Sequence, residues 1–207
     1  TTYFMALRKS LLFVLALLGC ATTPLQAQSL PNIDWETGTY ANWLYYTGSC
    51  CPISTPTGGT STPVTSRHTL ATGTTTDPYG GFPILSPWGG GYSVKLGNDV
   101  SGAQSERCRY YVHIPTGFTY YSLIYNYAVV LNDPGHSAYD QPRMEVKAYD
   151  SATGLVIPCD SFCYVANSSI PGFLTSSILA YGSPVRYMPW KMGNFKLNGL
   201  GGRTIAI

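Results

Sequence analysis

The segment from Tyr121 to Leu131 constrains the fold of this chain more than any other. Its odd positions are apolar or aromatic throughout, and none of its residues carries a charge. Alternation with a period of two is typical of a β-strand, and a strand without charges is typical of one buried on both faces. The sequence therefore predicts a central strand here, covered on both sides.

Other segments show weaker forms of the same pattern. No helical periodicity is sustained after residue 30, and residues 50–91 are so rich in Thr, Ser, Gly and Pro that long loops with at most one short strand are expected. Turn residues separate the remaining predicted strands, at 92–96, 108–114, 143–149, 155–157, 162–166, 185–190, 194–197 and 203–207. This order predicts an all-β, antiparallel sandwich, and the long connections favour a jelly-roll of the galactose-binding or lectin-like kind.

The end of the chain reads as a strand without a turn or a polar tail after it. Arg203–Ile207 is mostly apolar, so we expect a domain truncated at its C-terminal edge, a fragment of a longer protein. An unpaired apolar edge of this kind would make the domain less stable and more prone to aggregate.

The first residues have the three parts of a secretory signal. Arg8 and Lys9 are followed by an apolar run at 11–18, and Ala27 precedes a plausible cut at Gln28. The run is shorter than the ~20 residues that span a bilayer. We assign residues 1–28 to a signal peptide with N-terminal read-through and 29–207 to a single, incomplete domain. A lipoprotein signal that ends at Cys20 is the alternative.

Export, together with the charge of the mature chain, limits where the protein can act and which partners it can bind. Removal of the signal takes away two of the 12 basic residues and leaves 10, equal to the 10 acidic ones. A balanced charge argues against nucleic acid, which selects a basic face, and against electrostatic membrane binding. The expected location is secreted or cell-surface, without membrane insertion after the signal is removed.

Five cysteines remain after export, and oxidising compartments make disulfides the default. They are Cys50, Cys51, Cys108, Cys159 and Cys163. Adjacent cysteines rarely bond to each other, so Cys50 and Cys51 are expected to have separate partners. The favoured pair is Cys159–Cys163, which are close enough in sequence to close a small loop.

The sequence offers no catalytic constellation. The three histidines, His68, His113 and His136, lack metal-ligand spacing to one another or to cysteine. His136 lies in one short loop with Ser137 and two aspartates. Residues so close together in sequence rarely adopt the geometry of a catalytic triad of nucleophile, general base and orienting carboxylate. No pair of carboxylates is singled out for glycoside hydrolysis. We therefore predict that the domain is not an enzyme.

Binding is the better use of the unusual residues. The chain has 17 Tyr, 4 Trp and 7 Phe; most should be core, but exposed rings can stack on sugar faces. Trp88, in a Gly-rich loop, is the ring expected to be displayed, with Tyr92 and His136 as further ligand-binding candidates. Asp34 and Glu36 are candidate ligands for a structural calcium ion, although they are two oxygen donors where calcium needs ~6–8.

One long motif resembles a known module. Residues 125–137 (YNYAVVLNDPGHS), followed by 140–146 (DQPRMEV), are similar to a module of large Bacteroidota surface proteins. These are type IX secreted proteins with PKD or other Ig-like repeats and a gliding-motility-associated C-terminal tail. Further similar stretches are 32–43, 92–98, 159–173 and 185–190.

The resemblance implies a jelly-roll module without enzyme activity that acts in surface adhesion or glycan binding. It implies further Ig-like domains in the same polypeptide, and a continuation with an Asp-Cys and a Gly-His-Phe-Gly-Tyr-type motif that would account for the odd cysteine. In related binding modules a glutamate placed like Glu36 helps to hold calcium with a late aspartate, which this sequence lacks.

Two functions follow from these observations. The first is a non-catalytic adhesion or glycan-binding module whose partner is a surface glycan or a protein. The alternative is a substrate-binding accessory domain of a secreted protease or glycosidase whose catalytic domain lies outside this chain. Both would use the same sandwich and the same aromatic residues.

Overall fold

The structure, a computed structural model, describes residues 30–49, 59–158 and 161–207. The predicted signal peptide, Cys20, Cys50, Cys51 and Cys159 lie outside the described residues. No α-helix occurs within the described ranges, and so none there is long and apolar enough to cross a membrane.

The described chain is built from antiparallel strands, which confirms the all-β prediction. The strands are β1 (Leu44–Ser49), β2 (His68–Thr72), β3 (Tyr92–Leu96), β4 (Gln104–Arg109), β5 (Tyr111–His113), β6 (Ser122–Asn132), β7 (Arg143–Val146), β8 (Tyr149–Asp150), β9 (Phe162–Val165), β10 (Leu174–Thr175), β11 (Val185–Lys196) and β12 (Thr204–Ala206).

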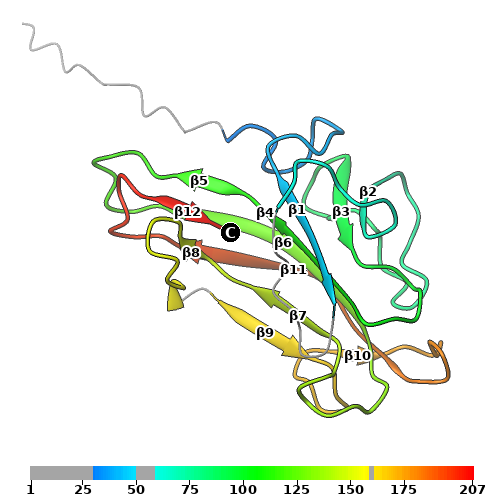
Figure 1. The fold of residues 1–207 in the computed structure, drawn as a ribbon. Coiled ribbons are helices and arrows are strands. Elements are labelled where there is room, and N and C mark those ends of the chain that lie inside the picture. The colour runs from blue at the N-terminus through cyan, green and yellow to red at the C-terminus, as the bar shows by residue number, and fades with distance from the viewer. Residues whose placement is uncertain (1–29, 50–58, 159–160) are drawn as a thin grey trace, which may run out of the picture.

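One layer of the sandwich is assembled from three small sheets. β1 pairs with β4, β12 lies between β5 and β8, and β7 pairs with β9. Only Tyr110 separates β4 from β5, and only two residues separate β7 from β8. The chain therefore continues from one small sheet into the next across this layer (Figure 1).

The other layer is the sheet β10–β11–β6, in which β6 and β11 form a long antiparallel pair. Its apolar side chains meet those of the first layer in the core. Phe195 of β11 and Leu197, which follows the strand, pack with Ile114, Ala148 and Ile205. Farther along, Val129, Leu131 and Met188 pack with Ala166 and other residues near β7 and β9. This packing establishes the sandwich, whereas the jelly-roll arrangement stays a prediction.

The central strand agrees with its predicted position but not with its predicted burial. β6 covers 122–132, and its inward positions Val129 and Leu131 are buried. Coverage on both faces is wrong, because Ile124 on the outer face is 62% exposed and Met192, on the neighbouring strand, is 53% exposed. Here the absence of charge reflects a half-buried strand of an antiparallel sheet, which commonly has one solvated face.

The last strand also differs from its prediction. Residues 203–207 were expected to form an unpaired apolar edge, but β12 pairs with strands on both sides. Ile205 is completely buried and Ala206 nearly so. The apolar composition of this segment therefore indicates a central strand, and the expectation of an unpaired edge is wrong.

The connection between β2 and β3 covers part of the outer face of the β10–β11–β6 sheet. The Phe82 ring stacks on Tyr187 with centroids 6.3 Å apart, and the Trp190 indole donates a hydrogen bond of 2.6 Å to the Pro83 carbonyl. These contacts hold residues 82 and 83 on the sheet, and the chain continues from them to the loop that carries Trp88.

Candidate ligand-binding site at the Trp88 loop

The site begins with a closed turn at the start of the domain. The buried Asn32 amide donates hydrogen bonds to the carbonyls of Thr39 (3.0 Å) and Ala41 (2.8 Å) and accepts one from the Thr37 backbone N–H (3.2 Å). Asn32 itself has a positive φ of 54°, which asparagine tolerates better than most residues. One side chain thus closes the segment from 32 to 41.

Two tryptophans fix this turn against the core. The Trp35 and Trp43 rings stack with centroids 3.9 Å apart, and each indole N–H has a partner: Tyr45 Oη for Trp35 and the Asn32 carbonyl for Trp43, both at 2.9 Å. Burial raises the pKa of Tyr45 to about 12, so its hydroxyl stays protonated at neutral pH. Trp35 has a φ of 60°, an uncommon value for a bulky residue.

The next residue, Glu36, joins the turn to the Trp88 loop. Its carboxylate accepts hydrogen bonds from the backbone N–H groups of Gly91 (2.7 Å) and Tyr92 (3.3 Å). Gly90 has a φ of 98°, and a Cβ added there would lie within 2.3 Å of a Glu36 oxygen. A glycine is therefore required for the loop to approach this carboxylate so closely.

Trp88 is displayed as predicted. Its side chain is 53% exposed, at the tip of a loop whose next residues are bound to Glu36. Tyr92 lies close by in sequence but is only partly exposed, and a Cβ at Gly38 would come within 2.8 Å of its hydroxyl oxygen. Tyr92 therefore packs on the opening turn and supports the loop, while Trp88 faces solvent.

His136 is placed on a different connection, between β6 and β7. Its backbone N–H donates to the side chain of the buried Gln141, which in turn donates to Asp133. Asp133 also binds Arg186 at 2.9 Å, and Ser137 donates to Asp140 at 2.8 Å. These hydrogen bonds build a rigid loop. Ser137 donates to a carboxylate and not to the histidine, so the arrangement differs from a catalytic relay.

The remaining histidines have structural surroundings. His113 is exposed on its strand, whereas His68, which the sequence placed in a polar loop, is buried at the start of β2. The Val64 N–H donates to His68 Nδ1 (3.2 Å), so the ring's proton is on Nε2, 3.1 Å from the Tyr46 carbonyl. This pattern fixes the neutral tautomer with the proton on Nε2.

The carboxylates proposed for calcium are used by the backbone. Asp34 accepts a hydrogen bond from the Glu36 N–H at 3.1 Å, and Glu36 is bound to the loop as described. Within the described ranges no three His, Cys, Asp or Glu residues gather as a metal site. Calcium at Asp34 and Glu36 stays a prediction, which a calcium titration of the native protein and of an Asp34→Asn variant would test.

The cysteines of the described ranges, Cys108 and Cys163, form no disulfide with each other or with another described residue. Burial raises the pKa of Cys108 to about 12, and burial together with Glu145 raises that of Cys163. Because Cys159 lies outside the described residues, the Cys159–Cys163 bond stays a prediction.

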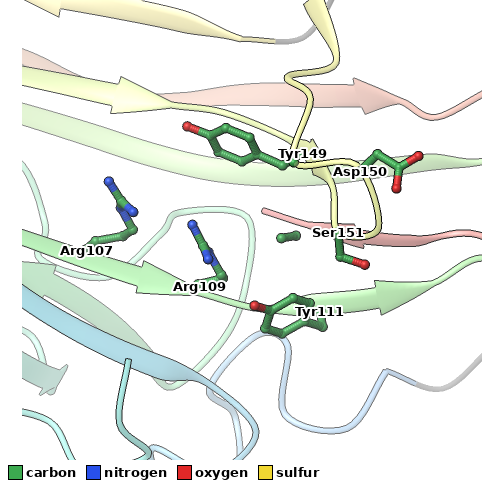
Figure 2. Close-up of a pocket in the computed structure, with 8 residues that line it drawn as sticks. Arg107, Arg109, Tyr111, Tyr149, Asp150 and Ser151 are labelled. Carbon is green, nitrogen blue, oxygen red and sulfur yellow. The ribbon is translucent and has the colours of Figure 1, made fainter. Parts of the chain in front are cut away.

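Sequence reasoning missed a cavity of about 300 Å³ between β4–β5 and β8. Figure 2 shows the Arg107 and Arg109 side chains directed toward Tyr149 across this space, with Tyr111 and Ser151 beside them. The Arg109 guanidinium lies 5.2 Å from the Tyr46 ring centroid and 5.8 Å from that of Tyr149. The sequence pattern does not indicate which strand lies opposite Arg107 and Arg109.

Comparisons with protein-family models, curated proteins and solved structures gave no match to this chain.

Proposed function

We propose that this domain is a non-catalytic binding module of an exported, cell-surface protein, and that Trp88 contacts a glycan. The observation that carries the proposal is the presentation of Trp88: a large aromatic ring is 53% exposed on a loop held by carboxylate hydrogen bonds. Tryptophan is enriched at interfaces, where its large ring contacts a ligand or partner.

The geometry favours a neutral sugar face as the ligand. Glu36, an acidic side chain at the base of the loop, is engaged by the backbone of residues 91 and 92. The contact surface at the tip is therefore an indole ring flanked by proline and glycines. A flat π surface without a free charge suits the apolar C–H face of a pyranose ring.

The order of the Trp88 loop before it binds a ligand also supports this proposal. A loop that is ordered before binding avoids part of the entropy lost when a ligand fixes it. The Glu36 carboxylate supplies that order, and the stacked Trp35 and Trp43 rings fix the segment from which Glu36 projects.

A glycan array followed by titration of the best ligand tests the proposal. The Trp88→Ala variant should lose affinity by about ten-fold or more, equivalent to roughly 1.4 kcal/mol. Tyr120→Ala is the matched control, because that ring is 79% exposed on a different loop and should leave affinity unchanged.

Two outcomes would contradict the proposal. Binding that survives Trp88→Ala would remove this ring from the site, and turnover of a glycan or a peptide by the domain would overturn the non-catalytic assignment. The alternative, an accessory domain beside a hydrolase, makes the same prediction for Trp88 and is distinguished by the activity of the domains that accompany this one.

A further inference from the structure

His68 is a buried titratable residue at the point where β2 meets the β1–β4 pair. It is the first residue of β2 and is 2% exposed. Its Nε2 lies 3.1 Å from the Tyr46 carbonyl of β1 and 3.3 Å from the Arg107 carbonyl of β4. The imidazole ring therefore holds the start of β2 against both strands of the pair.

The other ring nitrogen closes the turn that leads into β2. Nδ1 accepts a hydrogen bond from the Val64 N–H, and the His68 N–H donates to the Val64 carbonyl at 2.9 Å. Ser66, inside this turn, has a φ of 63°, a left-handed conformation that is strained for a residue other than glycine. The ring thus helps to hold a strained turn. We call residues 64–72, the turn and β2 together, the β2 segment.

This arrangement has no place for a second proton on the ring. Nε2 already donates, and a proton on Nδ1 would point at the Val64 N–H, so that two donors would face each other. Charging the ring in a buried position also carries a desolvation cost. Protonation therefore requires that the ring leave its position.

The groups around the ring do not compensate a positive charge. The titratable or charged side chains on the elements packed against His68 are Tyr40 of the opening turn, Tyr45 and Tyr46 of β1, Arg67 of the turn, Lys95 of β3, and Glu106, Arg107, Cys108 and Arg109 of β4. Glu106 is paired with Arg67, and the opening-turn carboxylates of Asp34 and Glu36 are held by backbone N–H groups. The unpaired charges of β4 are positive, so they oppose a further positive charge on His68.

We propose that His68 is an acid-sensitive switch, and that protonation of its ring releases the β2 segment from β1 and β4. Once the ring is in water, histidine takes up a proton at about pH 6.5. The proton binds the open conformation and not the closed one, so a falling pH favours opening.

The release also reaches the Trp88 loop. β2 pairs with β3 from His68 opposite Leu96 to Thr72 opposite Tyr92. Tyr92 follows Gly91, whose N–H binds Glu36 at the base of that loop. Movement of β2 therefore carries β3 with it and loosens the loop.

Amide hydrogen exchange of the chain of 207 residues, at pH 7.5 and at pH 5 and corrected for the intrinsic exchange rate, tests the switch. Protection at Val64 and Leu70 should fall by about thirty-fold at the lower pH, as expected for one proton linked to opening. Gly91 should lose protection over the same range. Leu197, whose N–H donates to the Tyr121 carbonyl in the other layer, should keep its protection. No ligand is needed, so failure of the switch is distinct from failure of the proposed function.

Variants assign the effect to one histidine. His68→Gln keeps a neutral donor and acceptor but cannot take up a proton, so protection should be equal at the two pH values. The double variant His113→Gln/His136→Gln is the matched control, because both of these histidines are exposed and His68 remains as the single histidine. It should keep the full pH effect, and it decides the question even where His68→Gln does not fold.

Four results would overturn the proposal. Equal protection of Val64 and Leu70 at both pH values in the native chain would remove the switch, and a pH effect that persists in His68→Gln would assign it to another group. A matching loss at Leu197 would indicate unfolding of the whole domain. Unchanged protection at Gly91 would remove the link to the Trp88 loop.

Discussion

Glu36 accepts a 2.7 Å hydrogen bond from the backbone N–H of Gly91, a residue 55 positions later in the chain. This bond ties the opening turn of the domain to the loop that displays Trp88. The carboxylate thereby acts on the candidate site through the conformation of the loop and does not itself need to touch the ligand.

Removal of this carboxylate should loosen the loop without unfolding the domain. We expect Glu36→Ala to lower the free energy of unfolding by about 1 kcal/mol, since both hydrogen bonds are near the surface, and to weaken glycan binding. Denaturant unfolding and amide exchange at Gly91 measure the two effects. Glu145→Ala is the control, because it removes another carboxylate whose ion pair, with Lys147, has both side chains exposed. Unchanged exchange at Gly91 would contradict the assigned role.

The tryptophan stack should contribute much more to stability. Trp43 is 6% exposed, packs on Trp35 and meets the Tyr110 ring edge-on with centroids 5.1 Å apart. Trp43→Ala should therefore lower the free energy of unfolding by about 3–5 kcal/mol. Trp88→Ala, which removes an exposed ring, should change it by less than about 0.5 kcal/mol. Similar losses for the two variants in denaturant unfolding would contradict the burial assigned to each ring.

The strands that the sequence predicted best are those with one buried face. In β6, β7 and the β4–β5 segment, alternate residues enter the core, and burial enforces the period that the sequence shows. β11 was predicted as two strands, 185–190 and 194–197, with a break at 191–193. The structure keeps one strand with a register shift between Met188 and Lys191, which accommodates Pro189, a residue that has no N–H.

The candidate site was only partly predictable. Trp88 could be recognised because a glycine-rich loop has no core to bury a ring. The anchoring role of Glu36 could not be, since a hydrogen bond across 55 residues depends on tertiary structure. The same holds for Arg109 and Tyr149, which come from different strands and meet only because β12 aligns β5 with β8.

The cysteines give a prediction about reactivity. With a pKa of about 12 and a partly buried position, Cys108 should resist alkylation of the native protein at pH 8. Cys163 is exposed and should react only after reduction if the predicted Cys159–Cys163 bond forms. Mass mapping with and without reductant distinguishes the cases. Rapid labelling of Cys108 would contradict its raised pKa, and labelling of Cys163 before reduction would contradict the disulfide.

Asp150 makes the stability of the domain depend on pH. The Ala152 N–H and the Arg203 guanidinium, which contact its carboxylate, hold the pKa of Asp150 below its usual value. A lowered pKa means that the folded chain binds the proton more weakly than the unfolded chain. The stabilisation is therefore complete above the unfolded pKa, roughly 3.9, and is lost as the pH falls through the folded value.

The Asp150→Asn variant tests this directly. Its amide oxygen can still accept from Ala152, but it cannot pair with Arg203 as a charge. We expect the variant to be less stable than the native protein at pH 7, and the difference to shrink as the pH falls below about 4. Urea unfolding at several pH values measures it. Asp99→Asn is the control, since the Lys95–Asp99 pair is more than half exposed and solvent screens it. A difference for Asp150→Asn that stays constant from pH 7 to pH 3 would show that the charge of this carboxylate does not stabilise the fold.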